Sequence, residues 1–133
     1  MPDNKAFVQS LYAAFGRGDI PFILAHADEA IAWSSSNSTG VVPWGGARQG
    51  RQDVQKFFEI LAANLDFEVF DPRRFASDGG LVFVQGRTVA KVKSTGRRFD
   101  MQWVHLFTVD GGRVTRFEEF YDTAGVTPAL RAG

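Results

Sequence analysis

Residues 98–121 read RFDMQWVHLFTVDGGRVTRFEEFY and contain two β-type segments, 98–109 and 113–121, joined by Asp-Gly-Gly. Side chains alternate between the two faces of a strand, so the odd-numbered residues of 98–109 share one face. That face is apolar apart from one histidine: Phe99, Met101, Trp103, His105, Phe107 and Val109. We therefore predict an antiparallel hairpin with one buried face, on which His105 is the only ionisable group of its strand.

Two further segments rich in Val and Phe precede this hairpin, at 67–77 and 81–93. They are separated by Asp-Gly-Gly at 78–80, and the second is separated from 98–109 by Ser-Thr-Gly-Arg at 94–97. Both separators have the composition of tight turns. The second half of the chain is therefore expected to form a four-stranded antiparallel meander, in which the register of 67–77 stays open.

The first half of the chain is mainly helical by its pattern. Apolar residues recur at helical spacing in 4–15 and in 51–64. Between these two helices we expect a short helix that starts at Asp19, a short strand at 30–33, and an irregular segment at 34–50. Helices that precede a run of strands are typical of the α+β class. A chain of 133 residues has the length of one domain, so 1–133 is treated as a single unit.

Turn lengths predict which residues face one another. A three-residue loop at 110–112 would place His105 opposite Phe117 and leave Glu119 one diagonal step away, within side-chain reach. A four-residue loop at 94–97 would place Gly86 opposite His105. The absent side chain of Gly86 then predicts a cavity beside the histidine, on one concave wall with Glu119.

Composition and charge exclude several classes of function. The 15 basic and 15 acidic residues cancel, and nucleic-acid-binding domains usually need a basic surface. The chain has no cysteine and two histidines, so neither a thiol site nor a metal site is predicted, and no cofactor is expected. No apolar run is long enough for a membrane span, and no signal peptide is apparent. We expect a cytoplasmic protein without nucleic-acid or membrane partners.

The order of elements resembles the nuclear transport factor 2-like superfamily, and within it the SnoaL-like and ketosteroid isomerase-related proteins. The similar positions are short motifs spread over the chain: Gly18-Asp19, Gly50-Arg51, Trp103–Phe107, Asp110–Val114 and Phe120–Thr123. The resemblance implies a cone-shaped α+β half-barrel, in which N-terminal helices pack on a strongly curved, mainly antiparallel sheet. It also implies a pocket between the sheet and the helices.

Ketosteroid isomerase uses an aspartate base with a tyrosine and a protonated aspartate as hydrogen-bond donors. The resemblance places Ser34, Leu11 and His105 at these three positions, so steroid isomerisation by that mechanism is not expected. His105 and Glu119 are the candidate catalytic pair, because a carboxylate beside an imidazole orients it for acid–base chemistry. The alternative is a buried pair whose members only satisfy each other's hydrogen bonds.

Eight further residues are candidates for the pocket wall, although a packed core is the commoner place for Tyr12 and Trp33, and Trp44 suits a lid or an interface. They are Trp103, Gly86, Thr88, Phe117, Tyr121, Trp33, Tyr12 and Trp44. Asp122 is expected to cap the residues that follow it rather than to act at the pocket mouth.

The opposite face of the sheet carries Val104, Leu106 and Phe120 among polar residues, which predicts a homodimer through that face. Three functions stay open. The first is an isomerase-, cyclase- or dehydratase-type enzyme acting on an apolar cyclic or polyketide-like molecule through His105 and Glu119. The second is a non-catalytic module that binds an apolar small-molecule ligand in the same pocket. The third is an interaction domain with a filled core.

Overall fold

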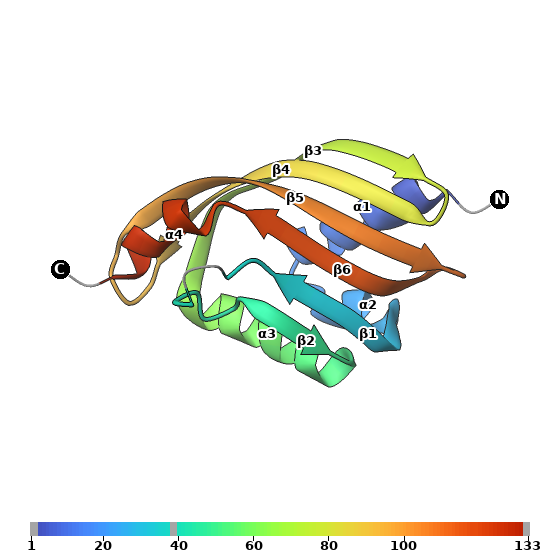
Figure 1. The fold of residues 1–133 in the computed structure, drawn as a ribbon, viewed down its shortest axis with the longest axis horizontal. Helices are drawn as coiled ribbons and strands as arrows, with labels where there is room; N and C mark the ends of the chain where they lie inside the picture. The colour runs from blue at the N-terminus through green and yellow to red at the C-terminus, as the bar shows by residue number, and fades with distance from the viewer. Residues whose placement is uncertain (1–2, 38–39, 132–133) are drawn as a thin grey trace.

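The computed structural model describes residues 3–37 and 40–131, which form a mixed α+β fold with helices packed against a curved, unclosed sheet (Figure 1). The elements are α1 (Asn4–Gly16), α2 (Ile20–Ala25), β1 (Ala27–Ser35), β2 (Gly46–Gln49), α3 (Arg51–Asn64), β3 (Leu65–Asp78), β4 (Leu81–Val92), β5 (Arg98–Asp110), β6 (Arg113–Tyr121) and α4 (Thr123–Leu130). The predicted α+β class is confirmed. Two elements were not predicted: β2, which lies inside the irregular segment 34–50, and α4.

Aspartate side chains cap the N-terminal ends of three of the four described helices. Asp3, Asp19 and Asp122 each accept a hydrogen bond from a backbone N–H in the first turn of the helix that follows. Such caps satisfy N–H groups that have no partner inside the helix. The predicted capping role of Asp122 is confirmed, and the helix that it starts packs beside β5.

The described strands form one sheet in the order β2-β1-β6-β5-β4-β3. Pairing is antiparallel except between β1 and β6, which run parallel. Strand β3 lies at one edge and its register with β4 shifts twice, once next to Pro72. Such β-bulges bend a sheet, and proline is tolerated at an edge because its missing N–H removes no ladder hydrogen bond there. The bending produces the concave face that α1, α2 and α3 cover (Figure 1).

The predicted registers of the two pairs β4–β5 and β5–β6 were each wrong by two residues. The last hairpin turns on Gly111 and Gly112 alone, and a bulge after Thr108 shifts the pairing further, so Glu119 lies directly opposite His105. The turn between β4 and β5 begins earlier in the chain than expected, because the Val92 N–H donates a hydrogen bond to the Arg97 carbonyl. A shift of two residues preserves the face of each side chain.

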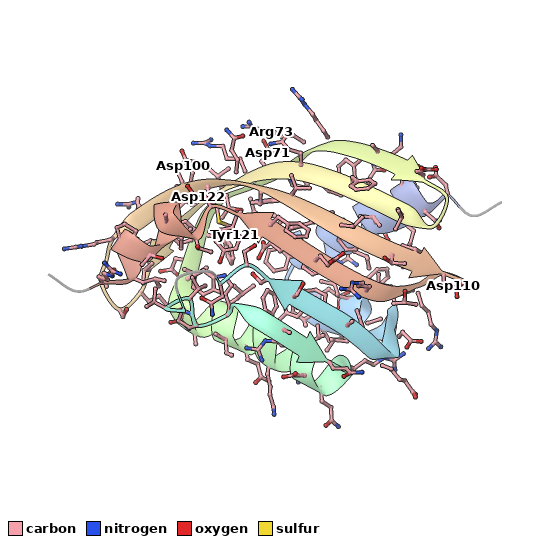
Figure 2. All side chains as sticks on the ribbon, in the orientation of Figure 1. Asp71, Arg73, Asp100, Asp110, Tyr121 and Asp122 are labelled. Atoms are coloured by element: carbon pink, nitrogen blue, oxygen red, sulfur yellow. The ribbon has the colours of Figure 1, made fainter. Side chains whose placement is uncertain are left out.

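The outer face of the sheet is partly apolar and partly charged. Phe83, Val104 and Phe120 are 40%, 39% and 51% exposed there. Around the bend of β3, β4 and β5 the surface is instead charged, with Asp71 and Arg73 paired at 2.8 Å and Asp100 paired with a neighbouring arginine (Figure 2). Within residues 3–37 and 40–131, no helix combines the length and the apolar character that a membrane crossing requires.

Candidate functional site

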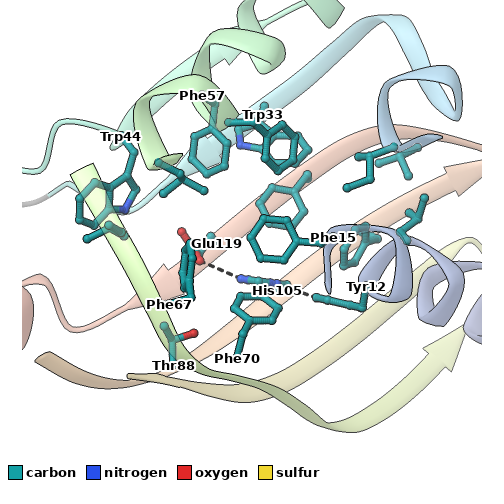
Figure 3. A pocket seen from close by; sticks show the side chains of 18 of the residues that line it. Tyr12, Phe15, Trp33, Trp44, Phe57, Phe67, Phe70, Thr88, His105 and Glu119 are labelled. Atoms are coloured by element: carbon teal, nitrogen blue, oxygen red, sulfur yellow. Dashed lines mark hydrogen bonds and ion pairs between the residues drawn. The ribbon is translucent and has the colours of Figure 1, made fainter. Parts of the chain in front are cut away.

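A cavity of about 90 Å³ lies between the concave face of the sheet and the first three helices (Figure 3). Its wall is almost entirely apolar, and rings from α1, β1, α3, β3, β5 and β6 supply most of it. Phe67, at the start of β3, is 37% exposed and marks the margin of the cavity. Tyr12, Thr88, His105 and Glu119 interrupt the apolar wall with polar atoms, and none of the described lining residues is Lys or Arg.

His105 and Glu119 form a buried hydrogen-bonded pair on this wall. His105 Nε2 lies 2.8 Å from Glu119 Oε2, and the two side chains are 5% and 10% exposed. The direct opposition of the two residues on β5 and β6 brings them together. Removing one partner of such a pair leaves the other buried without its hydrogen bond, which costs about 1–3 kcal/mol.

The second ring nitrogen of His105 is also occupied. The Tyr12 hydroxyl of α1 lies 2.6 Å from His105 Nδ1, and the planes of the two rings are nearly parallel, with an angle of 5° between them. Burial, together with the negative charge of Glu119, holds the pKa of the Tyr12 hydroxyl well above its usual range. Tyr12 therefore stays protonated at neutral pH.

Ser35 extends this arrangement on the other side of the carboxylate. Its hydroxyl, at the end of β1, donates a hydrogen bond of 2.6 Å to Glu119 Oε1. Tyr12, His105, Glu119 and Ser35 thus form one chain of hydrogen bonds across the sheet, which we call the polar chain. Tyr121 lies beyond it, where burial and the charge of Glu119 raise the pKa of its hydroxyl.

Three residues expected on the pocket wall lie elsewhere: Gly86, Trp103 and Tyr121 do not line the cavity. Gly86 opposes Trp103 instead of His105, and the space above it is filled by the indole of Trp103. Trp103 lies behind the histidine, stacked on the imidazole with ring centroids 3.8 Å apart. Its Nε1 donates a hydrogen bond of 2.8 Å to Thr88 Oγ1, which fixes the indole in place. The prediction that Gly86 opens the cavity was therefore wrong.

The remaining candidates line the cavity: Trp33, Trp44, Thr88, Phe117 and Tyr12. Trp33 stacks on Phe117 at 4.0 Å, and its indole N–H is buried without a hydrogen-bond partner among the described residues. Trp44 is only 2% exposed, so the segment 40–46 places it inside the protein rather than on an exposed lid.

Ser35 is the member of the polar chain that the sequence pattern did not indicate, and for Tyr12 the pattern indicated a place on the pocket wall but not the bond to His105. Tyr12 lies among the apolar residues of α1, where a tyrosine is usually part of the core. Ser35 reaches Glu119 because β1 pairs in parallel with β6, and no local pattern signals that pairing. In the described part of the chain, no group of three or more His, Cys, Asp or Glu side chains could hold a metal ion.

Comparisons with known proteins agree with this architecture. An NTF2-like protein of unknown function from Burkholderia pseudomallei is 26% identical with a TM-score of 0.89, covering 99% of this chain and 100% of its own. An NTF2-like protein from Burkholderia xenovorans is 29% identical with a TM-score of 0.85, covering 95% of this chain and 94% of its own. TerC, whose crystals were grown with polyporic acid, is 23% identical with a TM-score of 0.80, covering 94% and 95% of the two chains.

Other solved structures at 12–19% identity carry provisional names of isomerase or polyketide cyclase, and at that identity they show the fold alone. A search of the curated proteins found no match. The profile of the SnoaL-like domain matches residues 8–117, which includes the cavity wall from α1 to Phe117. The chain therefore belongs to the SnoaL-like domain family.

Proposed function

We propose that this protein is an enzyme that moves a proton on a small, neutral, mainly apolar cyclic molecule, as isomerases, cyclases and dehydratases do. The observation that carries the proposal is the buried Glu119 carboxylate, held by His105 and Ser35 on an otherwise apolar cavity wall. Apolar pockets with a few convergent polar groups are the usual form of small-molecule sites. A carboxylate in such a pocket suits general acid–base chemistry.

Glu119 is the better proton acceptor of the pair. Both ring nitrogens of His105 already have partners, so direct proton transfer between the imidazole and a ligand would break one of those hydrogen bonds. A carboxylate has about four acceptor positions, of which His105 and Ser35 use two. The remaining lone pairs of Glu119 can therefore accept a proton, while His105 orients the carboxylate.

The cavity also restricts the ligand. Since no Lys or Arg lines it among the described residues, an anionic ligand would find no counterion beside Glu119. A volume of about 90 Å³ is below the roughly 150 Å³ of a protein cavity that binds benzene. One six-membered ring therefore enters only with small outward shifts of lining side chains. A polyketide-sized ligand requires a wider opening, for which the partly exposed Phe67 at the margin is suitably placed.

A non-catalytic binding module is the second candidate, and one observation favours it. The buried indole N–H of Trp33, which has no partner among the described residues, would donate a hydrogen bond to an acceptor on any ligand, whether or not turnover follows. The cavity itself argues against the third possibility, an interaction domain with a filled core.

Proton exchange on a simple ketone separates the first two candidates. We would incubate 2-cyclohexen-1-one with the protein in D₂O and follow deuterium incorporation next to the carbonyl by NMR. The proposal predicts that the wild type makes deuterium exchange faster than it is in buffer alone. In Glu119→Gln this rate acceleration should be about 10²–10⁴-fold smaller. His26→Gln is the matched control, because His26 bonds to the Phe22 carbonyl and does not line the cavity. Binding of the ketone without faster exchange would contradict catalysis and support the binding module.

A further inference from the structure

The direction of the hydrogen bond between Tyr12 and His105 depends on the proton count of the imidazole. When the imidazole is neutral, Nε2–H donates to Glu119 and Nδ1 accepts from the Tyr12 hydroxyl. When a second proton is bound, Nδ1–H donates to the Tyr12 oxygen. The hydroxyl proton of Tyr12 must then point elsewhere.

The cavity is where a new partner for that proton can be found. Tyr12 and His105 both line the cavity, whereas the aromatic rings around Tyr12 offer it no strong acceptor: Phe70, Phe75, Trp103 and Phe107. Without a ligand, the hydroxyl of Tyr12 would be left as a buried, unsatisfied donor, which opposes protonation of His105. A ligand oxygen beside Tyr12 would remove that penalty.

We infer that Tyr12 is a ligand-binding donor controlled by His105: a carbonyl oxygen in the cavity accepts from Tyr12, and its binding is coupled to proton uptake by His105. The inference rests on the proposed function, since it concerns the same cavity and adds the group that holds the ligand oxygen. His105 is a positioning residue in this scheme. Glu119 accepts from Nε2–H in both states, so its carboxylate stabilises the imidazolium that forms.

The proton balance is simple. One proton enters from solvent and binds to Nδ1 of His105, the Tyr12 hydroxyl keeps its proton and rotates, and no covalent bond of the ligand changes. The titratable groups that face His105 are Tyr12 from α1 and Glu119 from β6, while β4 presents Val84. Ser35 donates to Glu119 on the far side of that carboxylate, and the charge of Glu119 also raises the pKa of Tyr121. Burial keeps the pKa of the Tyr12 hydroxyl high, so this group does not supply the proton that is taken up.

Coupling of this kind is reciprocal, so a falling pH must strengthen the binding of an acceptor ligand. Where His105 is neutral in the free protein, affinity for the ketone should fall by up to about tenfold for each unit of rising pH. The total change is limited by the value of one hydrogen bond from the charged pair, roughly ten- to hundredfold in affinity.

The test compares two rings of similar shape by calorimetry between about pH 5 and pH 9, the range in which histidine changes charge. One is 2-cyclohexen-1-one and the other is cyclohexene, which has no oxygen. We expect the wild type to bind the ketone more tightly as pH falls and to take up close to one proton, measured in buffers of different ionisation enthalpy. Cyclohexene should bind with the same affinity at every pH.

Tyr12→Phe retains the ring and loses the hydroxyl. In this variant the ketone should bind independently of pH and without proton uptake, while binding of cyclohexene should still be measurable, which shows that the cavity persists. Ketone binding with no pH dependence in the wild type would overturn the inference and leave the proposed function standing. Failure of the wild type to bind either ring would overturn both.

Discussion

Replacing Gly86 with alanine puts a methyl group into a space that the Trp103 indole already occupies. A Cβ atom built at Gly86 would lie far inside van der Waals contact with the six-membered ring of that indole and 2.7 Å from the Asp71 carbonyl oxygen. The indole would have to retreat by about 1 Å to reach ordinary carbon–carbon contact. It has little freedom to do so, because Thr88 holds its Nε1 and His105 stacks on its face.

The cost follows from these contacts. Overpacking a filled core destabilises by about 1–3 kcal/mol, and the two restraints on Trp103 favour the upper end of that range. Alanine also reduces the entropy of the unfolded chain, which offsets about 0.4–1 kcal/mol. We therefore expect a net loss of about 2 kcal/mol, or roughly 8 °C in Tm for a chain of this size.

Urea unfolding followed by tryptophan fluorescence measures this loss, with Gly125→Ala as the matched control. Gly125 lies in α4, and a Cβ there would meet no atom within 4 Å, so alanine should stabilise that helix by about 0.5–1 kcal/mol. If Gly86→Ala proved as stable as Gly125→Ala, the space opposite Trp103 would be open and the arrangement of indole and imidazole described above would be wrong.

Three further predictions concern the polar chain and the outer face of the sheet. Burial raises the pKa of Tyr12 in the folded state, so above pH 10 the unfolded chain loses this proton first and stability falls as pH rises. Tyr12→Phe should remove up to about 1.4 kcal/mol of that fall per pH unit, measured by urea unfolding. If the free energy of unfolding fell equally steeply with pH in the wild type and the variant, Tyr12 would not be buried. Ser35→Ala should cost about 1–3 kcal/mol, because the buried Glu119 carboxylate loses a donor, and an unchanged urea midpoint would show that the 2.6 Å bond contributes nothing. We also propose a homodimer through the outer face of β5 and β6, where Phe120 is 51% exposed. Leu106→Glu should convert this dimer to a monomer, as measured by light scattering. A wild type that is monomeric at about 100 µM would contradict the proposal.

The first three helices, the four long strands and their inward faces could be predicted because each depends on local sequence signals. A side chain on a strand keeps its face when the register shifts by two residues, so His105 and Glu119 were placed on one wall despite a wrong register. The direct opposition of these two residues depends on the short turn at Gly111 and Gly112 and on the bulge after Thr108, and the bulge has no clear local signal.

The His105–Glu119 pair of the polar chain was predicted, but the bonds of Tyr12 and Ser35 join distant segments and could not be predicted. Tyr12 reaches His105 across 93 positions, and Ser35 reaches Glu119 across 84. The predicted cavity beside Gly86 failed for a related reason. A missing side chain shows where volume is absent on one strand, but the large side chain of a neighbouring strand can fill it, as Trp103 does.

A crystal structure of the protein grown with 2-cyclohexen-1-one would test the proposed site most directly. The account predicts electron density for the ring inside the cavity, with its oxygen within hydrogen-bond distance of the Tyr12 hydroxyl and a ring carbon facing the Glu119 carboxylate. The His105 imidazole should remain between these two side chains. A ring bound elsewhere on the protein, or a cavity closed by its own lining side chains at saturating ketone, would contradict the assignment of this cavity as the ligand site.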